Sequence, residues 1–233
     1  MSEPPAFDPQ PDRPERGPPL RPKPAATLIL VRRDGPKPRV LMGRRHRGHA
    51  FMPSLWVFPG GRVDRADYRA PAASELDAET AARLARTGPR SLARALGMAA
   101  VRETFEEAGL LLAGPASPRP AAGPWAPFLE HGVAADLAAL AFVARAITPP
   151  RQPRRFDARF FMAEAERLVS LDPLPDCGEL DEIAWVELDE ARTLDLPSIT
   201  RFILSEIEAR LQQPDRPILS LRHIRGVQRT DIV

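Results

Sequence analysis

Short apolar runs separated by polar and turn-forming segments predict several β-strands. The first two, at 27–31 and 40–42, flank a Gly/Pro turn at 34–38 and predict a hairpin. Further strand-type runs lie at 55–58, 137–147, 156–162 and 183–186. The proline-rich segment 149–153 separates the two long runs, so they are predicted as distinct strands.

Two longer segments have helical periodicity instead. Residues 92–108 form the strongest predicted helix, which Gly109 ends. A second helix is predicted from about Ser198 to Leu211, with a buried stripe made of Ile199, Phe202, Ile203 and Ile207. Because strands and helices do not alternate regularly, the pattern indicates a layered α+β domain with a mixed sheet.

The remaining segments are predicted as tails or excursions. Residues 1–24 hold 9 of the 28 prolines and few apolar groups, which predicts a disordered tail or, alternatively, an arm that wraps the domain or a partner. Residues 25–213 form the predicted domain and 214–233 a C-terminal tail. Residues 66–92 are predicted as an excursion whose helix is capped by Ser74, with Asp77 three positions on.

Composition narrows the class of protein. The 233 residues carry 33 basic and 31 acidic side chains, so the net charge of +2 excludes a strongly basic nucleic-acid coat. All but two basic residues are arginine, which suits phosphate partners but also follows from coding bias. A soluble, cytoplasmic protein without a membrane partner is predicted by the single Cys177 and by the lack of an 18-residue apolar run. Four acidic residues within the first 15 positions also argue against a transit peptide. The oligomeric state stays open, with a homodimer among the alternatives.

The predicted helix at 92–108 separates apolar from acidic side chains. Its apolar face comprises Met98, Val101, Phe105, Ala108 and Leu112. Glu103, Glu106 and Glu107 lie on the opposite face, where they repel one another and oppose the helix dipole. A solvated acidic face is one interpretation. The other is a hard divalent cation, Mg²⁺ or Mn²⁺, which would reverse both unfavourable effects and direct the site to phosphate chemistry.

The segment from Arg102 to Leu110, Arg-Glu-Thr-Phe-Glu-Glu-Ala-Gly-Leu, resembles the second half of the Nudix box, G-x5-E-x7-R-E-U-x-E-E-x-G-U, in which U is a bulky apolar residue. Phe58-Pro59-Gly60-Gly61 resembles the strand and turn that open the box. The resemblance implies a Nudix-type α/β/α sandwich and a hydrolase that acts on a nucleoside diphosphate linked to another group.

The chain departs from the box at two places. Thr104 occupies a position that is usually aliphatic, and Arg102 follows Gly61 by 41 residues where the box requires 14, which implies an insertion of 27 residues. The first glutamate of the box is therefore ambiguous. Counting forward from Gly61 gives Asp67, and counting back from Arg102 gives Arg94.

The insertion makes the chain similar to one branch of the superfamily, the peroxisomal coenzyme A diphosphatases of animals and their bacterial relatives. The segments 48–53, 57–64 and 154–161 also resemble that branch. This resemblance implies coenzyme A or acyl-CoA as the small-molecule nucleotide substrate. The coenzyme A motif of other bacterial members is not evident before Phe58, so ADP-ribose, an ADP-sugar or NADH remain alternatives, as does a binding module without catalysis.

The resemblance also implies roles for particular residues. The metal ligands would be Glu103, Glu106, Glu107 and the carbonyl of Gly60 or Gly61, with Arg102 orienting the glutamates. The candidates for the general base are Glu107, Glu179 and Glu182. The candidates for binding the substrate phosphates are Arg44, Arg45, Arg47 and His49.

Overall fold

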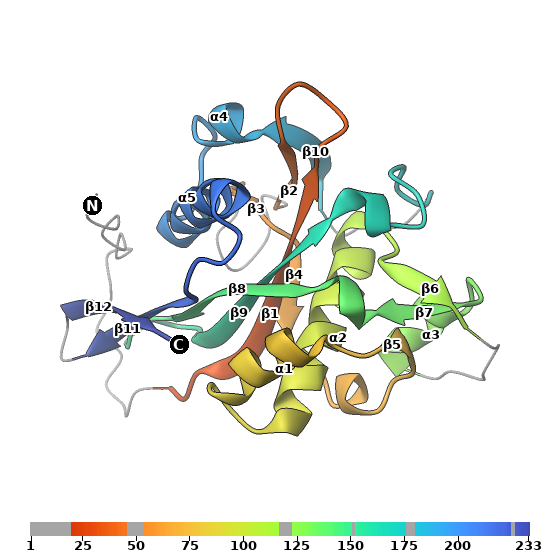
Figure 1. The fold of residues 1–233 in the computed structure, drawn as a ribbon, viewed down its shortest axis with the longest axis horizontal. Helices are drawn as coiled ribbons and strands as arrows, with labels where there is room; N and C mark the ends of the chain where they lie inside the picture. The colour runs from red at the N-terminus through yellow and green to blue at the C-terminus, as the bar shows by residue number, and fades with distance from the viewer. Residues whose placement is uncertain (1–19, 46–53, 117–122, 151, 176–179, 225–226) are drawn as a thin grey trace.

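A large mixed sheet dominates the computed structural model, which describes residues 20–45, 54–116, 123–150, 152–175, 180–224 and 227–233 (Figure 1). Nine strands of these residues form the sheet, in the order β10-β2-β1-β9-β8-β11-β12, with β3 paired to β2 and β4 to β1. The strands are β1 (Lys23–Arg32), β2 (Arg39–Arg44), β3 (Trp56–Val57), β4 (Gly60–Arg62), β8 (Ala141–Ile147), β9 (Phe156–Glu164), β10 (Glu182–Glu187), β11 (Leu219–Ile224) and β12 (Val227–Ile232).

β1 is the strand that places the glycine turn. It forms the predicted hairpin with β2 and pairs in parallel with β9. Near its N-terminal end it also pairs with β4, with Ala26 opposite Gly61 and Thr27 opposite Gly60. The two glycines are therefore held beside the middle of the sheet by backbone hydrogen bonds, which fixes their position relative to the neighbouring helix.

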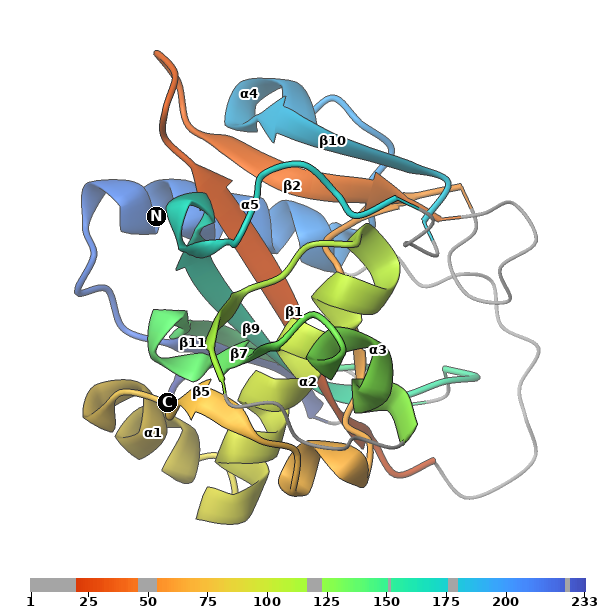
Figure 2. The same cartoon turned by 90° about the vertical axis from the view of Figure 1, so that its right-hand side faces the viewer.

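Two helices cover the opposite faces of the sheet. Leu28 and Leu30 of β1 pack in the core on the side of α2 (Arg90–Ala108), whereas Ile29 and Val31 pack on the side of α5 (Ser198–Gln212). Figure 2 shows the sheet between these two helices. Successive side chains of a strand point to opposite faces, so a strand buried on both sides is apolar throughout. The predicted α+β fold with a mixed sheet is confirmed.

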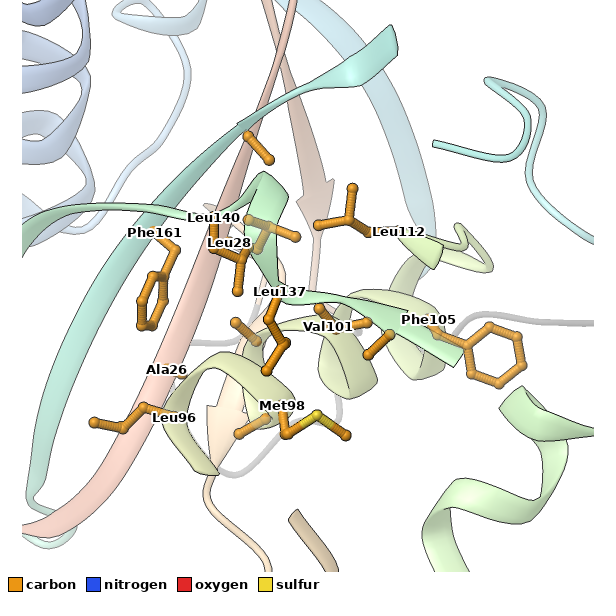
Figure 3. Close-up of a cluster of buried hydrophobic side chains, with 14 of the residues drawn as sticks. Ala26, Leu28, Leu96, Met98, Val101, Phe105, Leu112, Leu137, Leu140 and Phe161 are labelled. Atoms are coloured by element: carbon orange, nitrogen blue, oxygen red, sulfur yellow. The ribbon is translucent and has the colours of Figure 1, made fainter. Parts of the chain in front are cut away.

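The predicted apolar stripe of α2 is buried. Met98, Val101 and Phe105 are at most 4% exposed and meet Leu28 and Phe161 of the sheet in one core cluster (Figure 3). Gly109 ends the helix in the left-handed conformation, with φ of 66°. With its apolar stripe buried in the core, α2 presents the glutamates on its other side.

The predicted cap inside the 66–92 excursion is wrong. Asp77, not Ser74, is the N-cap of α1 (Ala78–Ala85), because its carboxylate accepts hydrogen bonds from the backbone N–H groups of Glu79 and Thr80. Ser74 belongs to a strand and donates its hydroxyl to Asp136, 62 residues away, at 2.5 Å. A local sequence pattern cannot predict so distant a partner. The contact joins the segment to β7 of a small second sheet. The sheet has the order β5-β7-β6 and consists of β5 (Ala72–Ser74), β6 (Ala113–Pro115) and β7 (Val133–Asp136).

The connections contain short helices that the pattern did not predict. Residues 137–139, expected to begin a strand, form a single 3-10 turn before β8. The other short helical segments are Ala66–Tyr68, Gly123–Trp125, α3 (Ala126–Leu129), Ala165–Arg167 and α4 (Leu188–Ala191). No helix in the described ranges is long and apolar enough to cross a membrane.

The interpretation of residues 214–233 as a tail is also wrong. β11 pairs in parallel with β8, with Leu221 opposite Ala146, and β12 closes a hairpin on β11. The segment thus extends the main sheet, because its backbone hydrogen bonds to β8 supply order that its sparse apolar content did not predict. At the other terminus, Lys23 and Pro24 belong to β1, and the rest of the predicted tail up to residue 19 lies outside the described residues.

Candidate active site

Arg102 is the buried centre of the acidic face of α2. One of its nitrogens, Nη1, donates to Glu103 Oε1 and to Glu106 Oε2, both at 2.8 Å. Nε and Nη2 donate to the two oxygens of Asp67 at 2.9 and 3.0 Å, and Nη2 also reaches the carbonyl of Arg62. One guanidinium therefore joins two glutamates of the helix to the loop that follows the glycine turn.

The surrounding carboxylates determine the charge of this guanidinium. Its side chain is 5% exposed, and burial by itself would lower the pKa of Arg102. The hydrogen bonds that Arg102 donates to Asp67 and the negative charges of Glu103, Asp67 and Glu106 outweigh burial and raise that pKa above its ordinary value. Arg102 is thus a permanent cation that compensates three carboxylates.

Asp67 and Arg94, the two candidates for the first acidic position of the box, have different surroundings. It is fully buried, lies in the 3-10 turn Ala66–Tyr68 and accepts hydrogen bonds from Arg102 and from the indole of Trp125 at 2.9 Å. Arg94, the other candidate, bonds instead to Glu75 and to the carbonyl of Ala70. Of the two candidate positions, Asp67 is therefore the one whose side chain bonds to Arg102.

The glycine turn lies directly against two of the glutamates. The backbone N–H of Gly60 donates to Glu107 Oε2 at 2.8 Å. A methyl group at Gly61 would overlap the carboxylate of Glu103, so only glycine allows this approach. Helix and turn consequently bring two carboxylates and the backbone of the two glycines together.

The donor set at this point suits a hard cation. Carboxylates of Glu103 and Glu107 and the backbone of Gly61 are all oxygen donors beside one cavity. In the arrangement described, however, no three acidic, histidine or cysteine side chains of the described residues are placed to hold a metal. The hydrogen bonds explain this, since Glu103 and Glu106 point to Arg102, and Glu107 points to the N–H of Gly60. A bound cation would have to compete with Arg102 for these oxygens.

A cavity of about 550 Å³ opens beside the glutamates. It is lined by Glu103, Glu107, Arg102 and Gly61, and by the side chain of Arg45. Apolar residues of the sheet and of the start of α5 contribute much of the remaining lining, including Phe58, Ala158, Phe160 and Ile199. Concave, partly apolar cavities with a few polar groups at one point are typical of small-molecule sites.

The structure separates the predicted phosphate-binding arginines. Arg45 lines the cavity, where its Nη2 lies 3.8 Å from Glu107 Oε1, and its Nε is buried without a hydrogen-bond partner among the described residues. Arg44 instead forms an exposed ion pair with Glu182 at 2.9 Å, and neither residue lines the cavity. Arg47, His49 and Glu179 lie outside the described residues. Of the predicted phosphate-binding residues, the described structure therefore favours Arg45. Of the predicted general bases, it favours Glu107.

Four other residues that line the cavity were not among the predicted site residues. Arg154, Phe156, His223 and Gln228 line it, and the last two come from the segment interpreted as a tail. The alternation of apolar and polar residues from Leu219 to Arg222 is the only local pattern that could have predicted a strand there. Nothing local could have placed that strand beside the cavity.

Comparison with known proteins agrees with this architecture. No protein-family model matches the chain. A Caenorhabditis elegans protein whose curated name assigns it to the nudix hydrolases is 29% identical over 180 residues, or 71% of this chain, and the chain spans 52% of that protein. The crystal structure of a NUDIX hydrolase from Alicyclobacillus acidocaldarius is 27% identical, with a TM-score of 0.52, and 85% of this chain and 86% of that one are covered. The NUDIX domain of Shewanella oneidensis NrtR, solved with ADP ribose, has 13% identity and a TM-score of 0.49, with 82% and 90% covered.

The fold is therefore that of the Nudix hydrolases. The two similarities above 25% identity, together with the glutamate helix and its glycine turn, support the placement of this chain in the Nudix hydrolase superfamily.

Proposed function

We propose that the protein hydrolyses the diphosphate of a nucleoside diphosphate linked to another moiety, with Mg²⁺ or Mn²⁺ as its cofactor. The observation that carries the proposal is the gathering of Glu103, Glu107 and Gly61 beside one cavity, with Arg102 tying Glu103 and Glu106 together. Oxygen donors with a cavity large enough for a nucleotide suit metal-assisted attack of water on phosphorus. We further propose that the protein acts in the cytoplasm, in keeping with its single cysteine.

The proposed ligands of the metal are Glu103, Glu106, Glu107 and the backbone carbonyl of Gly61. When bound, the cation would neutralise charge on the diphosphate and lower the pKa of a bound water. The chain itself supplies the geometry. Arg102 keeps Glu103 and Glu106 on one side of the helix, and its bond to buried Asp67 prevents its guanidinium from swinging into the cavity.

Two residues are proposed to act on the substrate and the water. Arg45 would bind a phosphate, because its buried Nε has no hydrogen-bond partner in the described structure and an anion would satisfy it. Glu107 is favoured as the general base over Glu182, which lies outside the cavity lining and pairs with Arg44. Glu179, the third candidate, is not among the described residues.

The proposed substrate is coenzyme A or an acyl-CoA. Support comes from the insertion within the box and from the segments 48–53, 57–64 and 154–161, which resemble the coenzyme A diphosphatase branch. ADP-ribose, an ADP-sugar and NADH share the same diphosphate and are the competing substrates.

The test is a substrate panel. The purified full chain is incubated with Mg²⁺ and coenzyme A, acetyl-CoA, ADP-ribose or NADH, and the products are separated by chromatography. Coenzyme A should yield 3′,5′-ADP and 4′-phosphopantetheine. Activity should disappear with excess EDTA, return with Mg²⁺, and fall at least about a hundredfold in Glu103→Gln and Glu107→Gln, because each removes a ligand charge.

Each negative result has a distinct meaning. Faster turnover of ADP-ribose than of any coenzyme A species would refute coenzyme A as the substrate but would support the proposed hydrolase activity. If no compound is cleaved faster than by the two glutamine variants while nucleotides still bind, the protein is a binding module that retains the Nudix fold.

A further inference from the structure

The cavity extends along the main sheet from the end of β2 to the β11–β12 hairpin. Arg45 follows β2, near the β10 edge, whereas His223 and Gln228 belong to β11 and β12 at the opposite edge. Between them the lining crosses β1, β9 and β8, where Ala26, Ala158 and Ala146 contribute. Figure 1 shows the β11–β12 hairpin at the end of the sheet away from β2 and β10. The glutamates lie between these two ends, beside β4 and β1.

In a cavity of this shape, the two halves of a bound diphosphate compound would extend in opposite directions from the glutamates. With its diphosphate at Glu103 and Glu107, one half of the substrate extends toward Arg45 and the other toward the hairpin. The hairpin direction ends in a group of five residues, which we call the far end of the cavity. It consists of Arg154, Phe156, Leu221, His223 and Gln228.

The far end combines an aromatic ring, an apolar side chain, an amide and one cation. Phe156 and Leu221 offer surfaces on which a flat heteroaromatic ring can pack. Gln228 offers both a donor and an acceptor, which match the edge of a purine. These features suit a nucleoside base better than a flexible aliphatic arm, which needs no such edge recognition.

Two basic residues are present at the far end, but only one is a cation near neutral pH. Burial lowers the pKa of His223 below its ordinary value of 6.5, so its ring is neutral at pH 7. Arg154 is exposed at the cavity and forms no ion pair with other described residues. A single unpaired arginine beside a base-binding surface suits one additional phosphate on the nucleoside.

We propose that the far end binds a 3′-phosphorylated adenosine, with the base packed on Phe156 beside the neighbouring side chains of His223 and Gln228 and the 3′-phosphate on Arg154. The proposal rests on the proposed function, whose substrate it makes specific. Arg154, in the connection between β8 and β9, is then the residue that distinguishes coenzyme A from ADP-ribose and NADH, which lack this phosphate.

The experiment measures binding without turnover. Isothermal titration calorimetry of the full chain with Mg²⁺ compares 3′,5′-ADP with 5′-AMP, neither of which contains a diphosphate bond. The wild type should bind 3′,5′-ADP about tenfold more tightly, because the additional phosphate forms a charge-assisted contact. Arg154→Gln should abolish that preference and leave 5′-AMP binding unchanged within about twofold. Gln228→Leu should weaken both nucleotides.

Arg229→Gln is the matched control. Arg229 neighbours Gln228 on β12, is exposed and does not line the cavity, so its loss should alter neither affinity. Circular dichroism and thermal unfolding establish that each variant is folded. If Arg229→Gln reduces the preference as much as Arg154→Gln, the effect is one of total charge and the proposal is wrong. It is equally wrong if the wild type binds the two nucleotides alike, binds neither, or if Arg154→Gln weakens both by the same factor.

Failure of this proposal is distinguishable from failure of the proposed function. If the protein prefers 3′,5′-ADP through Arg154 but cleaves no substrate, the proposed nucleotide site is correct and the proposed hydrolase activity is wrong. If the protein cleaves coenzyme A without that preference, the proposed hydrolase activity is correct and the proposed nucleotide site is wrong.

Discussion

Asp67 and Arg102 form a buried ion pair with two hydrogen bonds, although 35 residues separate them in the chain. The pair joins the 3-10 turn Ala66–Tyr68 to the glutamate helix. Because both side chains are at most 5% exposed, neither can recover its solvation if the other is lost. The segment after the glycine turn is thus connected to the site through Asp67.

Substitution Asp67→Asn tests this connection. It keeps the side chain's size but removes the charge that balances Arg102, so the free energy of unfolding should fall by about 3 kcal/mol. Urea denaturation at pH 7 measures the change. Asp215→Asn, at an exposed aspartate, serves as the control and should shift stability by less than about 0.5 kcal/mol. A loss below about 1 kcal/mol in Asp67→Asn would mean that Glu103 and Glu106 suffice to balance the guanidinium.

The two glycines of the turn should respond differently to alanine. At Gly60 a methyl group would lie 2.6 Å from the carbonyl oxygen of Ala26 and 2.7 Å from the Cα of Thr27, which are backbone atoms that cannot yield. At Gly61 the obstacle is the end of the Glu103 side chain, which can rotate away. We expect Gly60→Ala to lower the melting temperature markedly. Gly61→Ala should keep most of its stability but lose hydrolase activity, as Glu103 is displaced. Equal melting temperatures for the two variants would contradict this distinction.

Arg44 and Arg45 are adjacent in sequence but differ in their surroundings. Arg45→Gln should raise KM about tenfold, because a buried donor next to the glutamates no longer meets the substrate phosphate. Arg44→Gln breaks an exposed pair with Glu182, worth less than about 1 kcal/mol, and should change KM by less than about twofold. Steady-state kinetics with coenzyme A make the comparison. If Arg44→Gln raised KM more than Arg45→Gln, the substrate phosphate would bind at the β2–β10 edge of the sheet and not beside Arg45.

The N-cap of α1, Asp77, should make the free energy of unfolding depend on pH in the acidic range. Burial alone would raise the pKa of Asp77, but its hydrogen bonds from Thr80 and Glu79 outweigh burial and lower it. The folded pKa therefore lies below the unfolded value of about 3.9, so the cap stabilises fully above that pH and less as pH falls through the folded pKa. Asp77→Ala should cost about 1 kcal/mol at pH 7 and progressively less toward pH 3. Asp77→Asn, which caps without titrating, should match the wild type at pH 7.

Thermal unfolding of these three proteins between pH 7 and pH 3 measures the effect. A constant difference between the wild type and Asp77→Ala across that range would show that the carboxylate contributes nothing through its charge.

The sequence by itself determined the elements whose information is local. The helix Arg90–Ala108, its buried stripe and the opposite row of Glu103, Glu106 and Glu107 follow from spacings of three and four residues, and Gly109 ends the helix through its own conformational freedom. The hairpin of β1 and β2 was equally local, because a short turn leaves few other pairings.

Only the tertiary structure decided which distant groups meet. Ser74 lies in a strand and donates its hydroxyl to Asp136, 62 residues away, and Asp67 accepts hydrogen bonds from Arg102, 35 residues away. The hairpin of Leu219–Ile224 and Val227–Ile232 lines the cavity because β11 pairs with β8 at the open edge of the sheet. Such partners are far apart in the chain, and their contacts depend on backbone pairing and burial that no local spacing encodes.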